Sequence, residues 1–264
     1  YSNNLKINFY KLLVKKKSLD NLNSIFNNLK INVENYIPSP LSSSLATLTN
    51  DERELGSICL NLGHSTTSIA IYENKKLIYS DTLGIGSNNV TLDIARGVST
   101  NISSAERLKT LYGSLLSSPS DEHEIIEIPS LSEDKTQFRQ INRSFLNSII
   151  KPRMEETLEI IWQRIRHNNL QNKKIKNIII TGGGSELEGI EEYAKIIFSS
   201  NVRKASPLDK FNIGKTYKKA IYSDVIGTIL YEKDEFFHKY KDKLDKNRKK
   251  VSISGFFTWL DQYI

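Results

Sequence analysis

The amino-acid sequence predicts an α/β fold, and two stretches of the chain carry this prediction. In residues 56–83, apolar residues alternate with small or polar ones over Ile58–Leu62, and the alternation resumes after a polar turn. A second turn at Glu73–Lys75 leads into Leu77–Tyr79, so three short strands are expected side by side. In residues 176–190, an apolar strand, three glycines and the start of a helix follow one another.

Before the first of these stretches, the sequence predicts two strands and two helices. Lys6–Val14 has the pattern of a strand, and Ser18 is placed to cap a helix with apolar residues on one face. A second strand is expected through Val33 and Ile37, and the Pro-Ser-Pro sequence that follows breaks it. A short helix over residues 41–48 then precedes an acidic hinge at residues 51–54.

Residues 87–173 are expected to hold three helices and one strand. The first helix covers Val90–Arg96, and Ser103 or Ser104 caps the second. A strand over Ile125–Ile128 precedes the longest helix, in which Pro152 is expected to cause a kink. One apolar stripe of this helix is predicted to lie in the core, and it consists of Phe145, Leu146, Ile149, Ile150, Met154, Leu158, Ile161, Trp162 and Ile165.

The last third of the chain begins with the strand Asn177–Thr181 and the three glycines. A helix over Glu186–Phe198 is expected next, then a short strand around Val202 and a loop through Gly214. A final helix over Ala220–Leu230 is predicted to turn four apolar residues inward, namely Ile221, Val225, Ile226 and Ile229.

The turns in the two stretches are candidate anion-binding sites. The first turn gathers backbone N–H groups and hydroxyls on one corner, from Gly63, His64, Ser65, Thr66 and Thr67. Taken alone, this pattern is also typical of an ordinary hairpin turn. The second turn is poor in side chains and consists of Gly182, Gly183, Gly184 and Ser185. Ser185 and Glu188 have capping-box spacing, so a helix N-terminus that favours anions is expected there.

Four motifs, taken in order, identify a family that the chain resembles. The glycines match neither the Rossmann pattern nor the P-loop pattern. The motifs are N-L-G-H-S-T-T-S-I-A-I-Y, I-G-S-N-N-V-T-L-D-I-A-R-G, S-A-E-R-L-K-T-L-Y-G-S and I-I-I-T-G-G-G-S-E-L-E-G-I. Their order and spacing resemble the actin-like bacterial cell-division family FtsA, from the middle of that family's chain onward.

The resemblance implies an actin-like ATPase (ribonuclease H-like) fold. The second lobe is expected to be nearly complete and to follow the tail of the first lobe, whose N-terminal part is expected to be missing. The domains implied are 1–55 as the end of the first domain (1A), 56–86 with 174–235 as the second domain (2A), 87–173 as an inserted subdomain (2B), 236–250 as a basic linker and 251–264 as an amphipathic membrane-targeting helix.

The resemblance also implies a site for ATP with Mg²⁺. The turn at residues 63–67 would face the phosphates, the turn at residues 182–185 the adenosine, and Glu106 with Lys109 the ribose or base. Many actin-like ATPases have an aspartate where this chain has Asn61, and an amide neither acts as a base nor neutralises Mg²⁺. The chain is therefore expected to be an adaptor with at most weak ATPase activity. His64 replaces a small residue, and whether it donates to the phosphates or obstructs them stays open.

Composition limits the remaining functions. The 264 residues have a net charge of +7, a single cysteine and no apolar run as long as a membrane span. The lone Cys59 favours a cytosolic chain, because no internal disulfide can form. Seven Lys and Arg residues against two Asp gather in residues 239–250, and no basic face for nucleic acid is evident elsewhere.

Residues 251–264 are predicted to form an amphipathic helix that lies on an anionic membrane surface. Lys249 and Lys250 lead into it, and its apolar side carries Ile253, Phe256, Phe257, Trp259, Leu260, Tyr263 and Ile264. A helix docked on the protein's own body is the alternative. Since one such tail binds reversibly, a filament that presents many tails would attach more tightly.

The partners implied by the resemblance are FtsZ, other copies of the chain, the membrane and other divisome proteins. The implied location is the cytoplasmic face of the inner membrane at the division septum. Because half of the nucleotide site would be missing, weak ATP binding is expected from this chain. The rivals are a pilus-assembly adaptor such as PilM and a sugar-kinase-type phosphotransferase; nucleic-acid binding through the basic tail is a third alternative.

Overall fold

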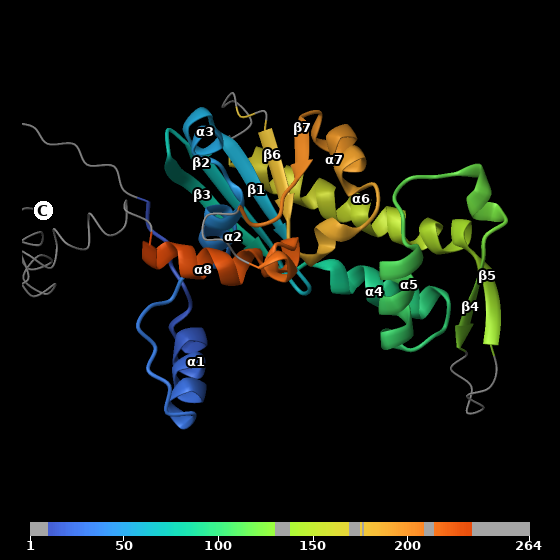
Figure 1. The fold of residues 1–264 in the computed structure, drawn as a ribbon, viewed down its shortest axis with the longest axis horizontal. Helices are drawn as coiled ribbons and strands as arrows, with labels where there is room; N and C mark the ends of the chain where they lie inside the picture. The colour runs from blue at the N-terminus through green and yellow to red at the C-terminus, as the bar shows by residue number, and fades with distance from the viewer. Residues whose placement is uncertain (1–9, 130–137, 169–174, 176, 209–213, 234–264) are drawn as a thin grey trace, which may run out of the picture.

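The computed structural model describes residues 10–129, 138–168, 175, 177–208 and 214–233, and these residues form an α/β fold around one sheet (Figure 1). The sheet has the strand order β3-β2-β1-β6-β7. Its strands are β1 (Ser57–Leu62), β2 (Thr67–Glu73), β3 (Lys76–Leu83), β6 (Asn177–Thr181) and β7 (Asn201–Lys204). Strands β1, β2 and β3 pair in antiparallel fashion, whereas β1, β6 and β7 are parallel. All five strands confirm the sequence prediction.

Strand β1 lies in the middle of the sheet and is buried along its whole length. Ile58, Leu60 and Leu62 point into the main core on one face, while Cys59 joins a smaller cluster on the other. This division follows from the two-residue period of a strand. Burial raises the pKa of the Cys59 thiol to about 11, so this residue is an inert part of the core.

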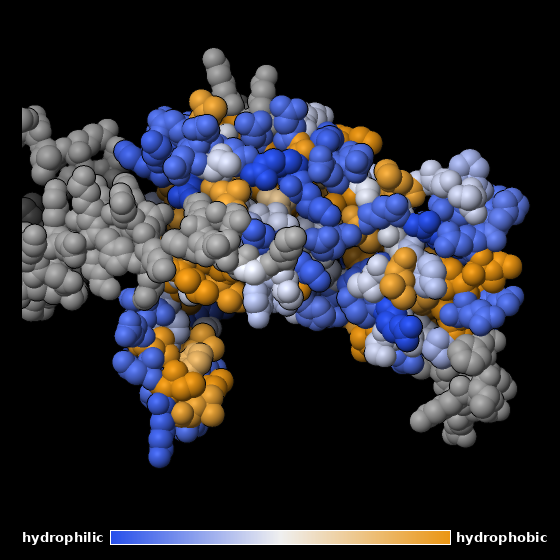
Figure 2. Space-filling model, in the orientation of Figure 1, coloured by the Kyte–Doolittle hydropathy of each residue, from blue (hydrophilic) through white to orange (hydrophobic). Residues whose placement is uncertain are grey.

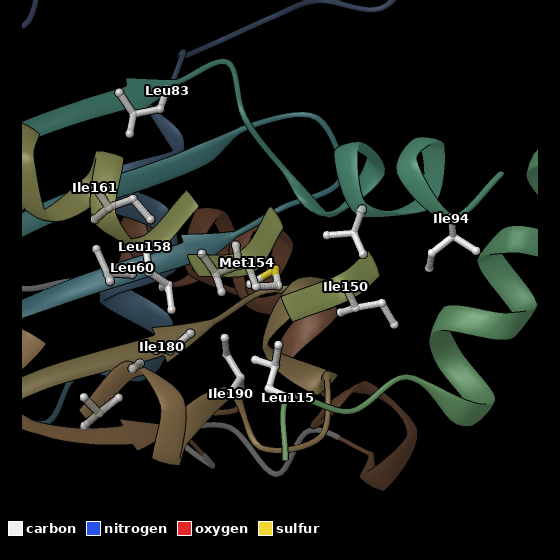
Figure 3. Packing of buried hydrophobic residues seen from close by; sticks show 14 of the residues in the cluster. Leu60, Leu83, Ile94, Leu115, Ile150, Met154, Leu158, Ile161, Ile180 and Ile190 are labelled. Carbon is white, nitrogen blue, oxygen red and sulfur yellow. The ribbon is translucent and has the colours of Figure 1, made fainter. Parts of the chain in front are cut away.

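Two helices cover the face of the main core. The 25-residue helix α6 (Arg143–His167) contains Pro152 and packs on the sheet together with α7 (Ile190–Phe198). Figure 3 shows Leu158 and Met154 of α6 over Leu60 and Ile180 of the sheet. Most of the predicted stripe is buried, but Phe145 is 45% exposed, so its assignment to the core was wrong. It lies in the first turn of α6, which extends beyond the sheet.

The opposite face is covered by α2 (Ser39–Thr47) and α3 (Asn50–Leu55), and α8 (Ser223–Lys233) packs on α2 (Figure 1). Helices α2 and α8 cross at Gly227, where an added Cβ would lie 1.6 Å from the carbonyl oxygen of Ser42. No side chain fits at this crossing. The predicted acidic hinge belongs instead to α3, because Thr49 and Glu52 form a capping box that starts a helix there.

The inward face predicted for the last helix was largely wrong. Ile226 is buried, but the other three residues are half or more exposed, namely Ile221, Val225 and Ile229. A 3₁₀ turn (η5, Ala220–Tyr222) precedes α8 and has fewer residues per turn than an α-helix. The apolar pattern read from Ala220 therefore falls out of phase, and Leu230 joins Ile226 on the inner side.

The segment between β3 and α6 extends away from the sheet at one end of the molecule (Figure 1). It contains α4 (Ser87–Gly97), α5 (Ile102–Tyr112), a 3₁₀ turn (η1, Pro119–Glu122), β4 (Ile125–Pro129) and β5 (Phe138–Asn142). Strand β5 was not predicted, because Phe-Arg-Gln-Ile-Asn has too few apolar residues to show alternation. Asn101 caps α5 by accepting from the Ser104 N–H at 2.8 Å, so the predicted serine caps were wrong.

The N-terminal part departs most from the prediction. Helix α1 (Lys16–Asn28) begins before Ser18, which therefore is not its cap. Within residues 10–55 the structure has no strand, so the strand through Val33 and Ile37 was wrong; of the strand predicted at 6–14, residues 10–14 are not a strand and the rest lies outside the described residues. Helix α1 buries no residue, and Figure 2 shows its apolar side chains exposed along one side. A strand needs backbone hydrogen bonds to a neighbouring strand, and among the described residues no strand pairs with these segments.

An ion pair between α3 and β7 fixes the edge of the sheet and gives a first testable prediction. Arg203 Nε and Nη2 donate to Glu52 Oε1 and Oε2, each at 2.7 Å, and Nη2 also donates to the Thr47 carbonyl. Burial raises the pKa of the Glu52 carboxyl, but hydrogen bonds from Arg203 and Thr49 outweigh it and lower this pKa below 4.5. We expect Arg203→Ala to lower the free energy of unfolding by about 2 kcal/mol at pH 7, measured by urea denaturation.

The pH dependence of this effect has a defined sign. A carboxyl whose pKa is lowered on folding stabilises the protein above its unfolded pKa, and the contribution is lost as pH falls through the folded value. The difference between wild type and Arg203→Ala should therefore shrink below pH 4.5. The neighbouring Lys204 makes an exposed pair with Glu186 at 3.2 Å, so Lys204→Ala should cost less than about 0.5 kcal/mol. Equal costs for the two variants would contradict the assignment.

Among the described helices, none combines the length and apolar character that crossing a bilayer requires. The basic linker and the predicted amphipathic helix, including Lys249, Lys250 and the apolar residues from Ile253 to Ile264, lie outside the described residues.

Candidate functional site

The two predicted turns lie side by side at one edge of the sheet. Strands β1 and β6 are parallel neighbours, with Asn61 opposite Thr181, so the turns that follow them leave the sheet together. A Cβ added to Gly182 would lie 2.1 Å from Asn61 Oδ1 and 2.6 Å from the Leu62 carbonyl oxygen. Turns separated by more than a hundred residues in the sequence thus form one surface.

The glycines of the second turn serve different purposes. Gly182 has φ of +87°, which favours glycine, and a Cβ on Gly184 would lie 2.9 Å from Leu62 Cβ. By contrast, a Cβ on Gly183 would meet only Ile221, at 3.5 Å. Gly182 and Gly184 are therefore required by the fold, whereas Gly183 leaves an open space.

The helix predicted directly after these glycines starts later. Residues Gly183–Glu186 form a 3₁₀ turn (η3), and α7 begins at Ile190 after Gly189, whose φ is +78°. The predicted capping box is not formed, because the Ser185 hydroxyl donates to the Gly182 carbonyl at 2.7 Å and Glu188 accepts from Arg143 at 2.6 Å. The second turn therefore does not present a helix N-terminus.

The first turn directs its carbonyl groups and its N–H groups to different sides. The carbonyls of Gly63 and His64 accept from the first N–H groups of α4, those of Ser87 and Asn88, at 2.9 and 2.8 Å. Within the described part of the chain, no group accepts from the N–H of His64 or Ser65. Together with the exposed Thr66, these residues leave donors free for an anion. Thr67 is buried and donates to the Ile85 carbonyl, so its hydroxyl is occupied.

The buried Lys109 and the half-exposed Glu106 of α5 form a hydrogen-bond network with α4. Lys109 is 8% exposed, and its Nζ donates to Glu106 at 2.7 Å, to Thr91 at 2.8 Å and to the Ser87 carbonyl at 3.2 Å. Burial raises the pKa of Glu106, but hydrogen bonds from Lys109 and Thr91, together with the charge of Lys109, lower it overall. All three donors of Lys109 are used, so its role is to hold Glu106 as an anion.

A cavity of about 170 Å³ lies between the end of α5 and the second turn. Its walls come from α4, α5, α6 and the second turn, and they include Ser87, Val90, Lys109, Thr110, Leu111, Gly113, Met154, Gly183, Gly184, Glu186, Leu187 and Glu188. Of the predicted site residues, Lys109, Gly183 and Gly184 line it. The volume is below the ~300–1,000 Å³ usual for small-molecule sites, so the cavity has room for only part of such a ligand.

Sequence reasoning missed a carboxylate beside Asn61. Asn61 Nδ2 donates to Asp224 Oδ2 of α8 at 2.9 Å. Ser42 of α2 donates to Asp224 Oδ1 at 3.1 Å, and Ser39 donates to Oδ2. In the sequence, nothing marks Asp224 as part of a site, because acidic residues are common in the first turn of any helix. Only the packing of α2 and α8 against β1 brings it to position 61.

Comparison with known proteins gives the family. The model of the family described as cell division protein FtsA matches residues 58–227. The cell division protein FtsA of Rhizobium meliloti (strain 1021) is 36% identical over 228 residues, which are 86% of this chain and 52% of that protein. FtsA of Agrobacterium fabrum (strain C58) is 36% identical over 232 residues, 88% of this chain and 52% of that one. The chain thus spans about half the length of these curated relatives.

Solved structures support the actin-like fold. MreB 5 of Spiroplasma citri bound to AMPPNP has a TM-score of 0.66 at 15% identity, covering 89% of this chain and 68% of that one. A PilM–PilN type IV pilus biogenesis complex gives a TM-score of 0.61 at 14% identity, covering 82% and 58%. At these identities the likeness concerns the fold alone. With the family match over residues 58–227, it shows that the chain has an actin-like ATPase fold and belongs to the FtsA family of cell division proteins.

Proposed function

We propose that this chain binds ATP, assembles with other copies of itself and tethers FtsZ to the cytoplasmic face of the cell membrane at the septum. The observation that carries the proposal is the cavity between α5 and the second turn, because its lining residue Ser87 donates its N–H to the Gly63 carbonyl of the first turn at 2.9 Å. The MreB 5 structure with a similar fold contains AMPPNP, which supports a nucleotide as the ligand.

The proposed pose divides the nucleotide among these features. The base enters the cavity, where Val90, Leu111 and Met154 offer apolar surface beside the backbone of Gly183. The ribose lies toward Glu106, whose carboxylate accepts from hydroxyls. The phosphates lie over His64–Thr66, where free N–H groups stabilise negative charge. In this pose His64 donates to the phosphates rather than obstructing them.

The chain is proposed to be an adaptor and not an efficient ATPase. The Asn61 amide donates to Asp224 at 2.9 Å and has no basic atom with which to activate water. Turnover by Asn61 itself is therefore absent, and nucleotide binding serves assembly. A phosphotransferase of the sugar-kinase type would instead show ATP turnover stimulated by its substrate.

We further propose the domain division 56–86 with 174–235, interrupted by an inserted subdomain at 87–173 that faces FtsZ. In support, the segment from α4 to the start of α6 carries large apolar side chains outside the cavity that are 45% exposed or more, namely Ile102, Leu116, Ile125 and Phe145. Exposed apolar side chains that form a contiguous patch are typical of an interaction surface.

The membrane role rests on the sequence of residues 251–264 and gives a second prediction. Trp259→Asp places a charge on the apolar side of the proposed helix, so pelleting with anionic liposomes should fall at least about tenfold. FtsZ should co-sediment with the liposomes only when the chain is present with Trp259 intact. The measurement is a liposome co-sedimentation assay with and without FtsZ, using the whole protein.

Gln262→Asp adds the same charge on the polar side of the helix and is the matched control. It should pellet nearly as well as wild type, because its side chain stays in water. Equal pelleting of both variants would contradict the anchor proposal. Retention of Trp259→Asp on DNA, without loss of pelleting, would favour a nucleic-acid role instead.

A further inference from the structure

Asp224 is a carboxylate without a cationic partner. It lies in the first turn of α8 and accepts hydrogen bonds from Asn61, Ser39 and Ser42, all of which are neutral. In the described part of the chain, no Lys or Arg forms an ion pair with it. A partly buried carboxylate is usually balanced by a positive charge, so three neutral donors leave Asp224 able to face a cation.

Asp224 lies close to the two glycine-rich turns. Asn61 links Asp224 to the second turn. Its Nδ2 donates to Asp224, and its Oδ1 lies so close to Gly182 that a Cβ added there would be only 2.1 Å from it. A buried hydrogen bond between Ser223 and Thr181, 2.6 Å long, ties the start of α8 to β6. The carboxylate is thus held at the sheet edge from which both turns leave.

We infer that Asp224 is the carboxylate that faces the divalent cation of the bound nucleotide. The inference rests on the proposed function. Mg²⁺ prefers oxygen ligands, keeps several waters and is usually held by one or two carboxylates together with phosphates. The oxygens of Asp224, Asn61 Oδ1 and the hydroxyls of Ser39 and Ser42 fit this preference. Among the described residues, no three or more His, Cys, Asp or Glu side chains are grouped so that they could hold a metal ion, so the cation is expected only together with the nucleotide.

A purely structural role is the competing explanation, because Asp224 also links α2, α8 and β1. The dependence of nucleotide affinity on Mg²⁺ separates the two roles. For the wild-type chain, we expect ADP to bind about tenfold more tightly in saturating Mg²⁺ than in EDTA, as measured by equilibrium titration. In Asp224→Asn the ratio should fall below about twofold, with the affinity in EDTA unchanged or higher.

Two further variants complete the experiment. Ser42→Ala removes one hydrogen bond but keeps the carboxylate, so the Mg²⁺ ratio should persist. The exchange Asn61→Asp with Asp224→Asn moves the carboxylate to β1, and the ratio should return to near the wild-type value. If Asp224→Asn does not fold, the inference is tested with the double variant Asn61→Asp, Asp224→Asn.

The outcomes distinguish the inference from the proposed function. Wild type and Asp224→Asn binding ADP with the same Mg²⁺ ratio would overturn the inference and leave nucleotide binding intact. A ratio that stays lost in the exchanged protein would also overturn it. If the wild-type chain binds no ADP at all, the proposed function and the inference fail together.

Discussion

Replacing Gly183 with leucine is expected to weaken ATP binding by about 100-fold or more without changing the unfolding temperature. Gly183 lines the 170 Å³ cavity, and among the described residues other than its chain neighbours, only Ile221 Cγ2, at 3.5 Å, lies within 4 Å of its absent Cβ. Its φ is not positive, so the backbone tolerates a side chain. Leucine would therefore occupy the volume proposed for the base while leaving the packing of β1 and β6 undisturbed.

Gly84→Leu is the matched control for this effect. Gly84 is exposed, and nothing lies within 4 Å of its absent Cβ, so the same side chain is added away from the cavity. Affinity and unfolding temperature should both stay at wild-type values, as measured by fluorescence titration and by thermal denaturation. Unchanged ATP affinity in Gly183→Leu would show that the base lies elsewhere.

Gly227→Ala is expected to lower the free energy of unfolding by about 3 kcal/mol, because its added Cβ would make the shortest contact found for any described glycine. The added Cβ would lie 1.6 Å from the Ser42 carbonyl oxygen and 2.9 Å from its Cα, and backbone atoms cannot rotate away. Alanine favours a helix over glycine by only ~1 kcal/mol, so the clash decides the sign. Helix α8 must then move away from α2.

The next residue gives the control for Gly227→Ala. Thr228 is exposed on α8 and its hydroxyl donates to the Asp224 carbonyl of the same helix. Thr228→Ala should therefore change the free energy of unfolding by less than about 0.5 kcal/mol. Urea denaturation at pH 7 measures both variants. A Gly227→Ala protein as stable as wild type would mean that α2 and α8 cross further apart than described here.

The central sheet could be predicted because its strands are marked by local patterns of apolar residues. Ile58, Leu60 and Leu62 alternate toward the main core, and Asn177–Thr181 form a continuous apolar run between two neighbouring strands. Strand β5 could not be predicted, because its short polar sequence shows no apolar alternation. It is a strand because its backbone pairs with β4. The inner face of α8 was missed because the 3₁₀ turn at Ala220–Tyr222 shifts the helical period.

The two turns of the candidate site could be predicted from the sequence, but the hydrogen bonds between its side chains could not. The glycine-rich turns are local features, and parallel pairing of β1 with β6 joins them. Asp224 belongs to a helix more than 160 residues from Asn61, and nothing local announces their 2.9 Å hydrogen bond. Likewise, the motif that contains Lys109 indicates a ligand contact, whereas its buried Nζ is saturated by Ser87, Thr91 and Glu106. Side-chain partners brought together by tertiary packing are what a single sequence leaves open.

The most direct test of the account is a titration of the ¹⁵N-labelled chain with ADP and Mg²⁺, followed by amide chemical shifts in NMR spectra. If both turns contact one nucleotide, the amides of residues 63–66 and of residues 182–185 will shift together and give the same dissociation constant. Shifts confined to one turn, or two different dissociation constants for the two turns, would contradict a shared nucleotide site.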